Sequence, residues 1–100
     1  MVTKPSKTAI ENVVYLALEE LRSRFSELRD IPKSRNSLLF GTGGALDSLS
    51  LVNLVVILEE KLESELGQTV SLVDEKALNQ EMSPFHSVGA LVDYIESACQ

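Results

Sequence analysis

The sequence has a single cysteine, Cys99, and no tryptophan. One cysteine cannot form a disulfide within the chain, which favours a reducing compartment. No apolar run approaches the roughly 18 residues of a membrane-spanning helix, and the first ten residues lack the apolar segment of a secretory signal peptide. We therefore expect a cytoplasmic protein that does not insert into membranes.

Positive charge is also scarce. The chain carries 9 Lys and Arg residues against 15 Asp and Glu residues, which gives a formal net charge of −6. Nucleic acid is disfavoured as a partner because its phosphates would be repelled, whereas a basic protein surface would be attracted. We assign no residues as a catalytic centre or as metal ligands.

The composition fits one small domain with an aliphatic core. Hydrophobic residues make up 44% of the 100 residues, but aromatic residues only 5%. Domains of about this length are common, so we expect a single domain over residues 1–100, with its core at about 8–98, and a monomer. Helix-forming residues dominate, and no internal repeat is visible.

The first helix is predicted from Thr8-Ala9-Ile10-Glu11, which matches a capping box. Apolar residues then recur at the spacing of one buried helical face: Ile10, Val13, Val14, Ala17, Leu18, Leu21, Phe25 and Leu28. Ile31-Pro32 predicts its end, because proline strains a helical conformation in the residue before it.

Residues 32–46 carry no helical pattern and predict a long loop. Three consecutive apolar residues within it are expected to pack on the core: Leu38, Leu39 and Phe40. The second helix should begin at Asp47 or Ser48 and end at Leu66, before Gly67. Its buried stripe is Leu51, Leu54, Val55, Leu58, Leu62 and Leu66.

Two further helices are predicted in the last third of the chain. A short one follows Asp74, with Leu78 and Met82 facing inward, and ends before Ser83-Pro84. Ser87 can cap the last one, whose apolar face is Val88, Leu91, Val92, Ile95 and Cys99. The expected fold is all-α: a small four-helix bundle of three main helices and one short helix, with a long loop between the first two.

The glycine-rich stretch before the second helix does not fit a nucleotide-binding loop. In Gly41-Thr42-Gly43-Gly44-Ala45-Leu46, a leucine stands where the dinucleotide fingerprint requires a small residue. The P-loop pattern fails as well, because no Lys-Ser or Lys-Thr pair follows. The sequence therefore predicts a flexible turn that leads into the helix.

Asp47 and Ser48 open that helix, and a structural role as an N-cap and first-turn residue explains them. Three apolar residues lie on the side of Ser48, rotated away from the buried stripe: Leu49, Val52 and Val56. Two acidic residues continue this side: Glu59 and Glu63. An apolar patch with an acidic rim indicates a docking surface. The alternative is a central helix that is buried on most sides.

Asp47-Ser48-Leu49, placed between a glycine-rich loop and the helix LSLVNLVVILEEKL, resembles the motif of the acyl carrier protein family. The resemblance extends from about Thr8 to Ala98 and includes the closing VGALVDYI. It implies that Ser48 is esterified by 4′-phosphopantetheine, transferred from coenzyme A by a phosphopantetheinyl transferase. The thiol of this arm then carries acyl or aminoacyl groups as thioesters, and the protein has no catalytic activity of its own.

The resemblance also implies roles for the neighbouring residues. Asp47 helps to position the metal-bound phosphate of the transferase, and a phosphodiester suits a helix N-terminus. The family positions that contact partner enzymes are Leu49, Val52 and Val56. Expected partners are the transferase, an acyl- or aminoacyl-loading ligase, and acyltransferases or synthases with basic docking surfaces. By the same analogy, the bundle interior shelters a short acyl chain.

The chain departs from the fatty-acid members of that family, which commonly read D-S-L-D-x-V-E-L. Ser50 and Asn53 stand in place of two acids, and Lys61 follows the pair Glu59-Glu60. Each lost acidic contact at an exposed rim is worth a fraction of a kcal/mol. We therefore expect a specialised pathway rather than housekeeping fatty acid biosynthesis, with an aminoacyl or peptidyl carrier as an alternative.

Two other classes of protein compete with the carrier. A hydrolase with Ser48 as nucleophile and His86 as base is disfavoured, since this is the only histidine and no acidic residue is assignable to orient it. A helical interaction domain with an unmodified Ser48 stays open.

Overall fold

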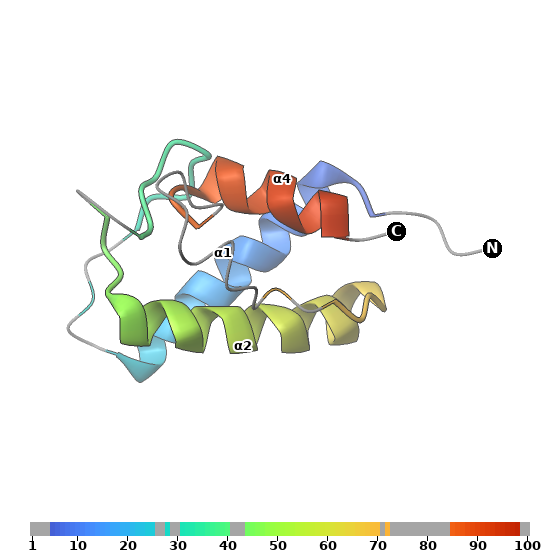
Figure 1. Cartoon of the computed structure of the whole chain (residues 1–100). Helices are drawn as coiled ribbons and strands as arrows, with labels where there is room; N and C mark the ends of the chain where they lie inside the picture. Colours follow the sequence, from blue (N-terminus) through green and yellow to red (C-terminus); the bar gives the residue numbers. More distant parts are fainter. Residues whose placement is uncertain are drawn as a thin grey trace.

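The computed structural model describes residues 5–25, 28, 31–40, 44–70, 72 and 85–98. These form three helices: α1 (Lys7–Arg24), α2 (Ser48–Leu66) and α4 (Val88–Ala98). The backbone of α1 packs closely against both other helices and lies between them (Figure 1). The described part of the chain is thus a compact all-α globule, with a long loop between its first two helices. The predicted short helix with Leu78 and Met82 lies outside the described residues, as does Cys99.

The predicted start of α1 is wrong by two residues, because the N-cap is Ser6 and the capping box was predicted at Thr8. Ser6, not Thr8, is the N-cap, and its side-chain oxygen accepts from the amide of Ala9 at 3.2 Å. Ser6 has an extended backbone (φ −72°, ψ 158°), which an N-cap requires. Glu11 then lies two residues beyond the capping-box position, and its Oε2 accepts from the Tyr15 hydroxyl at 2.7 Å instead of capping an amide.

The end of α1 is also earlier than predicted. The helix ends at Arg24, because Phe25 leaves the helical region (φ −124°, ψ 83°) while its amide still donates to Leu21 at 2.9 Å. Phe25 and Leu28 nevertheless pack against the core, and Ile31 is buried within it. The apolar spacing therefore identified residues that reach the core, but the last of them do so without a helix.

The loop between α1 and α2 is attached to the beginning of α4. Backbone amides of Leu39 and Phe40 donate to the carbonyls of His86 and Phe85, at 2.8 and 3.1 Å. Further along, the amide of Gly89 donates to the carbonyl of Arg35 at 2.9 Å. As predicted, Leu39 is completely buried and Phe40 packs against the core. The prediction is wrong for Leu38, whose side chain is 40% exposed because it lies on the opposite side of this extended backbone.

Ion pairs on the surface connect the same elements. Arg35 pairs with Glu11 of α1 at 3.5 Å and with Asp93 of α4 at 3.2 Å. Lys7 pairs with Asp93 as well, also at 3.2 Å. The pKa of Asp93 is held below its usual value, with the hydrogen bond from Lys7 as the main cause. These groups are largely exposed, so each pair contributes at most about 1 kcal/mol.

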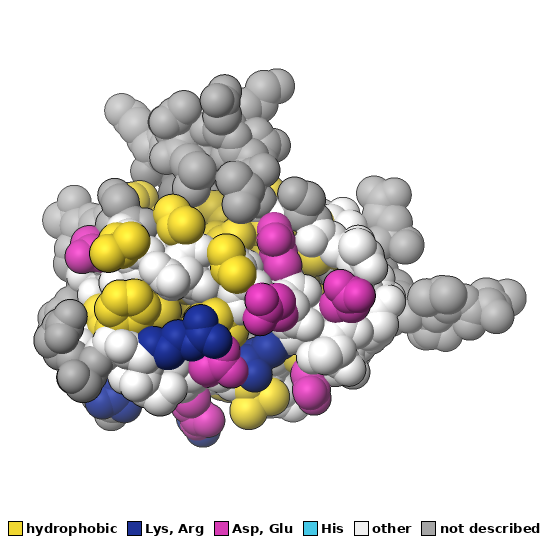
Figure 2. Space-filling model, turned by 90° about the horizontal axis from the view of Figure 1, so that it is seen from below, with side chains coloured by type: hydrophobic (Ala, Val, Ile, Leu, Met, Phe, Trp, Pro, Cys, Tyr) yellow, Lys and Arg dark blue, Asp and Glu magenta, His cyan; other side chains and the backbone are white. Residues whose placement is uncertain are grey.

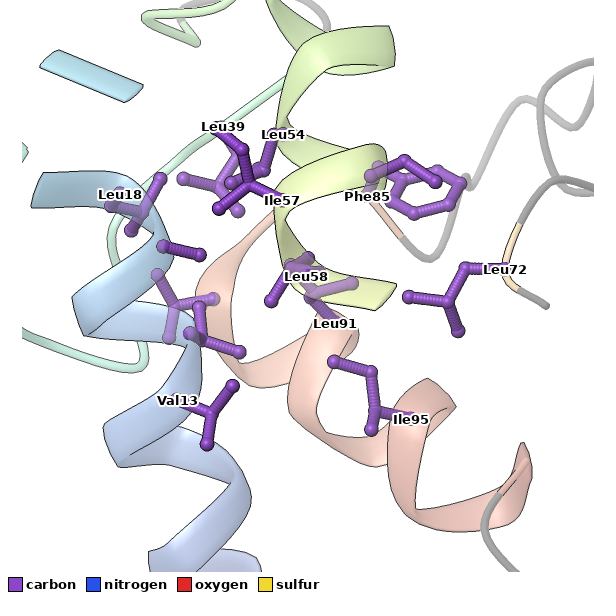
Figure 3. Packing of buried hydrophobic residues seen from close by; sticks show 14 of the residues in the cluster. Val13, Leu18, Leu39, Leu54, Ile57, Leu58, Leu72, Phe85, Leu91 and Ile95 are labelled. Carbon is purple, nitrogen blue, oxygen red and sulfur yellow. The ribbon is translucent and has the colours of Figure 1, made fainter. Parts of the chain in front are cut away.

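The core is one aliphatic cluster to which every described element contributes. The predicted stripe of α2 is confirmed, since Leu51, Leu54 and Leu58 are buried, together with Ile57. On α4, the predicted cap Ser87 accepts from the amide of Ala90 at 3.2 Å. The inward residues of α4 are buried: Val88, Leu91, Val92 and Ile95. Leu72 and Phe85 extend the cluster beside α2 and α4 (Figure 3).

Candidate functional site at the start of the second helix

Asp47 and Ser48 begin α2, as the sequence predicts. Asp47 is the N-cap, and its Oδ1 accepts from the amide of Ser50 at 2.8 Å. Its carbonyl accepts the first intrahelical bond, from Leu51 at 2.9 Å. Ser48 is the first helical residue, and its side chain lies outside what the structure describes. The backbone of Ser48 thus stands at the positive end of a 19-residue helix.

The carboxyl group of Asp47 is exposed and ionised at neutral pH. The hydrogen bond from the Ser50 amide is the main cause that lowers its pKa below the usual value. Asp47 therefore adds a fixed negative charge to the helix N-terminus, while one of its two oxygens is occupied by the cap.

The loop before Asp47 requires glycine for space at one position. A Cβ atom at Gly44 would lie 2.7 Å from the carbonyl carbon of Leu39, closer than such atoms approach. The amide of Leu46 donates to the carbonyl of Leu39 at 2.8 Å, which holds the two chain segments together. Gly44 is therefore required because it has no side chain, whereas the sequence suggested that it provides flexibility. Gly41 and Gly43 lie outside the described residues.

The side of α2 that follows Ser48 is apolar and exposed. Leu49, Val52 and Val56 are 64%, 53% and 46% exposed, although they belong to the same helix as the fully buried stripe. Hydrophobic side chains gather on this face of the molecule, with acidic side chains beyond them (Figure 2). The predicted exposed apolar patch is therefore confirmed, and the alternative of a helix buried on most sides is wrong.

The acidic residues on this face are not equivalent. A shallow groove of about 340 Å³ is lined by Val56, Glu59, Glu60, Glu63, Thr69 and Val70. Glu60 and Glu63 are exposed, whereas Glu59 is partly buried and its Oε2 accepts from the backbone amide of Leu72 at 2.7 Å. Sequence reasoning placed Glu59 on the rim and missed this contact, because no periodicity relates a helical residue to an amide 13 positions later.

The sequence departs from the motif that it resembles at Ser50, Asn53 and Lys61, and their places in the structure differ from expectation. Ser50 is only 4% exposed, so the prediction that it is a rim position is wrong: it belongs to the inner side of the first helical turn. Asn53 is partly buried, and its Nδ2 donates to the carbonyl of Leu49 at 2.9 Å. Lys61 points toward α1, where it pairs with Glu20 at 3.3 Å.

The other described parts of the structure bring together fewer groups that could form a functional site. His86 is exposed, and its backbone carbonyl accepts from Leu39. A second hollow of about 310 Å³ lies between α1 and the loop, beside Tyr15, Ile31 and the ion pair of Glu19 with Lys33 (2.7 Å). Within the described residues, acidic, histidine and cysteine side chains form no metal-binding group of three or more. None of the helices described is long and apolar enough to span a membrane.

Comparisons of the chain with known protein families, with curated proteins and with solved structures find no match.

Proposed function

We propose that the chain is an acyl carrier protein, in which Ser48 takes a 4′-phosphopantetheine arm and α2 presents the arm to partner enzymes. The observation that carries the proposal is the combination at the start of α2. A serine opens a long helix behind an aspartate N-cap, and an exposed apolar side follows it: Leu49, Val52 and Val56. In this proposal the protein is a carrier and catalyses no reaction itself.

The start of α2 fits a covalently attached phosphodiester. The N-terminal end of a helix stabilises negative charge through its amides and its dipole. Asp47 lies exposed at the same point and carries charge at neutral pH, so it is available to a metal ion that a transferase brings. When attached, the group supplies a thiol that holds an acyl or aminoacyl cargo. The residues of this chain contribute the attachment point and the surface around it.

The four-helix form of the bundle belongs to this proposal as well. Three helices are described, and the fourth would be formed after Asp74. The specialised pathway rests on Asn53, because Ser50 is buried and Lys61 is paired with α1. An aminoacyl or peptidyl carrier would use the same attachment point and the same surface.

The proposal is tested by modification in vitro. The purified chain is incubated with coenzyme A, Mg²⁺ and a broad-specificity phosphopantetheinyl transferase, and the intact protein is weighed by mass spectrometry. We expect a mass increase of one phosphopantetheinyl group, which is absent in Ser48→Ala. Ser50→Ala is the matched control, since it removes the other serine of the motif and should still be modified.

An unchanged mass in the parent chain would refute the carrier and favour the rival, an interaction domain with an unmodified serine. Modification that persists in Ser48→Ala would move the attachment point elsewhere. If the carrier is correct, mass spectrometry of the chain isolated from its native cells identifies the cargo, and this separates an acyl carrier from an aminoacyl carrier.

A further inference from the structure

Glu59 lines the groove on α2, yet its carboxylate binds a backbone amide of the same chain. Its Oε2 accepts from the Leu72 amide at 2.7 Å, a short distance that is typical of hydrogen bonds to charged acceptors. The side chain of Leu72 is completely buried and lies near α4 (Figure 3). The carbonyl of Leu72 accepts from the Tyr94 hydroxyl of α4 at 3.4 Å. Residue 72 is thus held by α2 on one side and by α4 on the other.

This arrangement satisfies a backbone group that would otherwise be costly to bury. Leu72 itself belongs to no helix or strand, and among the described residues the acceptor for its amide is the Glu59 carboxylate. Loss of this acceptor would leave the Leu72 amide without a partner at a partly buried position. The free-energy cost of such an unsatisfied amide exceeds the net stabilisation that an average hydrogen bond provides. Glu60 and Glu63 line the same groove but are exposed, and their carboxylates form no hydrogen bond or ion pair with the described residues.

We propose that Glu59 is a positioning residue that fixes Leu72 in the core between α2 and α4, and that Glu60 and Glu63 supply the acidic contacts to a basic partner. The first half concerns the chain alone. The second half rests on the proposed function, with the phosphopantetheinyl transferase as the partner. The groove supports it, because three glutamates line it and none of its described lining residues is basic.

The first half is tested by amide hydrogen exchange of the ¹⁵N-labelled full chain. In Glu59→Ala, we expect the Leu72 amide to exchange about tenfold faster or more, because a hydrogen bond to a charged acceptor is lost. Glu59→Gln should restore most of the protection, since its side-chain oxygen can still accept. Glu63→Ala is the matched control and should leave the exchange of Leu72 unchanged.

The second half is tested with the transferase, by measuring kcat/KM for the chain as a function of salt. Glu63→Gln should lower kcat/KM at low salt and reduce its salt dependence, as the loss of an exposed attractive charge does. Glu59→Gln removes the same formal charge and should change both quantities much less.

Equal exchange of Leu72 in Glu59→Ala and in the parent chain would refute the positioning role. A loss of kcat/KM in Glu59→Gln as large as that in Glu63→Gln would refute the assignment of docking to the other glutamates. If the transferase does not modify even the parent chain, the docking half fails together with the proposed function. The exchange rates still decide the positioning role in that case.

Discussion

Leu38 and Leu39 are adjacent leucines in the loop, and the structure predicts opposite consequences for replacing them. Leu39 is completely buried against the helices, whereas Leu38 is 40% exposed. Leu39→Ala removes most of a buried aliphatic side chain and leaves a cavity, which typically costs about 2–5 kcal/mol. The free energy of unfolding of a domain of this size is about 5–15 kcal/mol, so this single change should remove a large part of it.

The backbone hydrogen bonds of Leu39 survive the substitution, so the loss measures side-chain packing. Its amide still donates to His86 and its carbonyl still accepts from Leu46, both at 2.8 Å. Urea unfolding followed by circular dichroism at 222 nm gives the free energy of unfolding of each variant. Leu38→Ala is the matched control and should stay within about 0.5 kcal/mol of the parent chain, as exposed positions usually do.

A Leu38→Ala variant that is destabilised as much as Leu39→Ala would contradict the way in which the loop is seated. It would mean that the opposite side of this segment faces the helices. Because the two leucines alternate along an extended backbone, such a result would shift the whole segment by one residue relative to the beginning of α4.

Three further predictions concern single groups. Gly44→Ala should lower the melting temperature, because its Cβ would press on the backbone of Leu39, and wild-type stability would contradict that contact. Burial, followed by a hydrogen bond to a glutamate, raises the pKa of Tyr15 to about 12. As the pH rises, the unfolded chain loses this proton before the folded chain does. The contribution of Tyr15 to the free energy of unfolding should therefore be fully present below pH 10 and be lost between pH 10 and pH 12. Thermal unfolding at each pH should show this fall, and Tyr15→Phe should lessen it. Ser87→Ala removes the cap on the Ala90 amide and should cost about 1 kcal/mol in urea unfolding, whereas an unchanged midpoint would show that this cap is dispensable.

Hydrophobic spacing predicted the parts of the fold that depend on helical periodicity alone. It identified the buried stripe of α2 and the separate exposed side of Leu49, Val52 and Val56, because one helix turns its residues by a fixed angle. Asp47, Gly67 and Ser87 were found as caps for a similar reason. Their side chains or dihedral preferences act within three or four residues of their own position.

The features that sequence reasoning missed depend on contacts between distant residues. Ser6 and Thr8 are both acceptable caps, and local preference did not choose between them. Phe25 has the correct spacing for a helix, but it packs on the core from outside the helical region. The bond from Leu72 to Glu59 and the pairing of Lys61 with Glu20 join separate segments, and each changes which charges the α2 face offers to a partner.

The central place of α1 has a consequence for how the chain could be divided. The backbones of α2 and α4 each pack closely against α1 and not closely against each other within the described residues. A fragment that begins after the first helix would therefore lack the support that its two helices share, and should be largely unstructured in isolation. Adding the first 25 residues back as a separate peptide should restore the helical signal of the mixture, so that assembly of the whole can be followed as a bimolecular association.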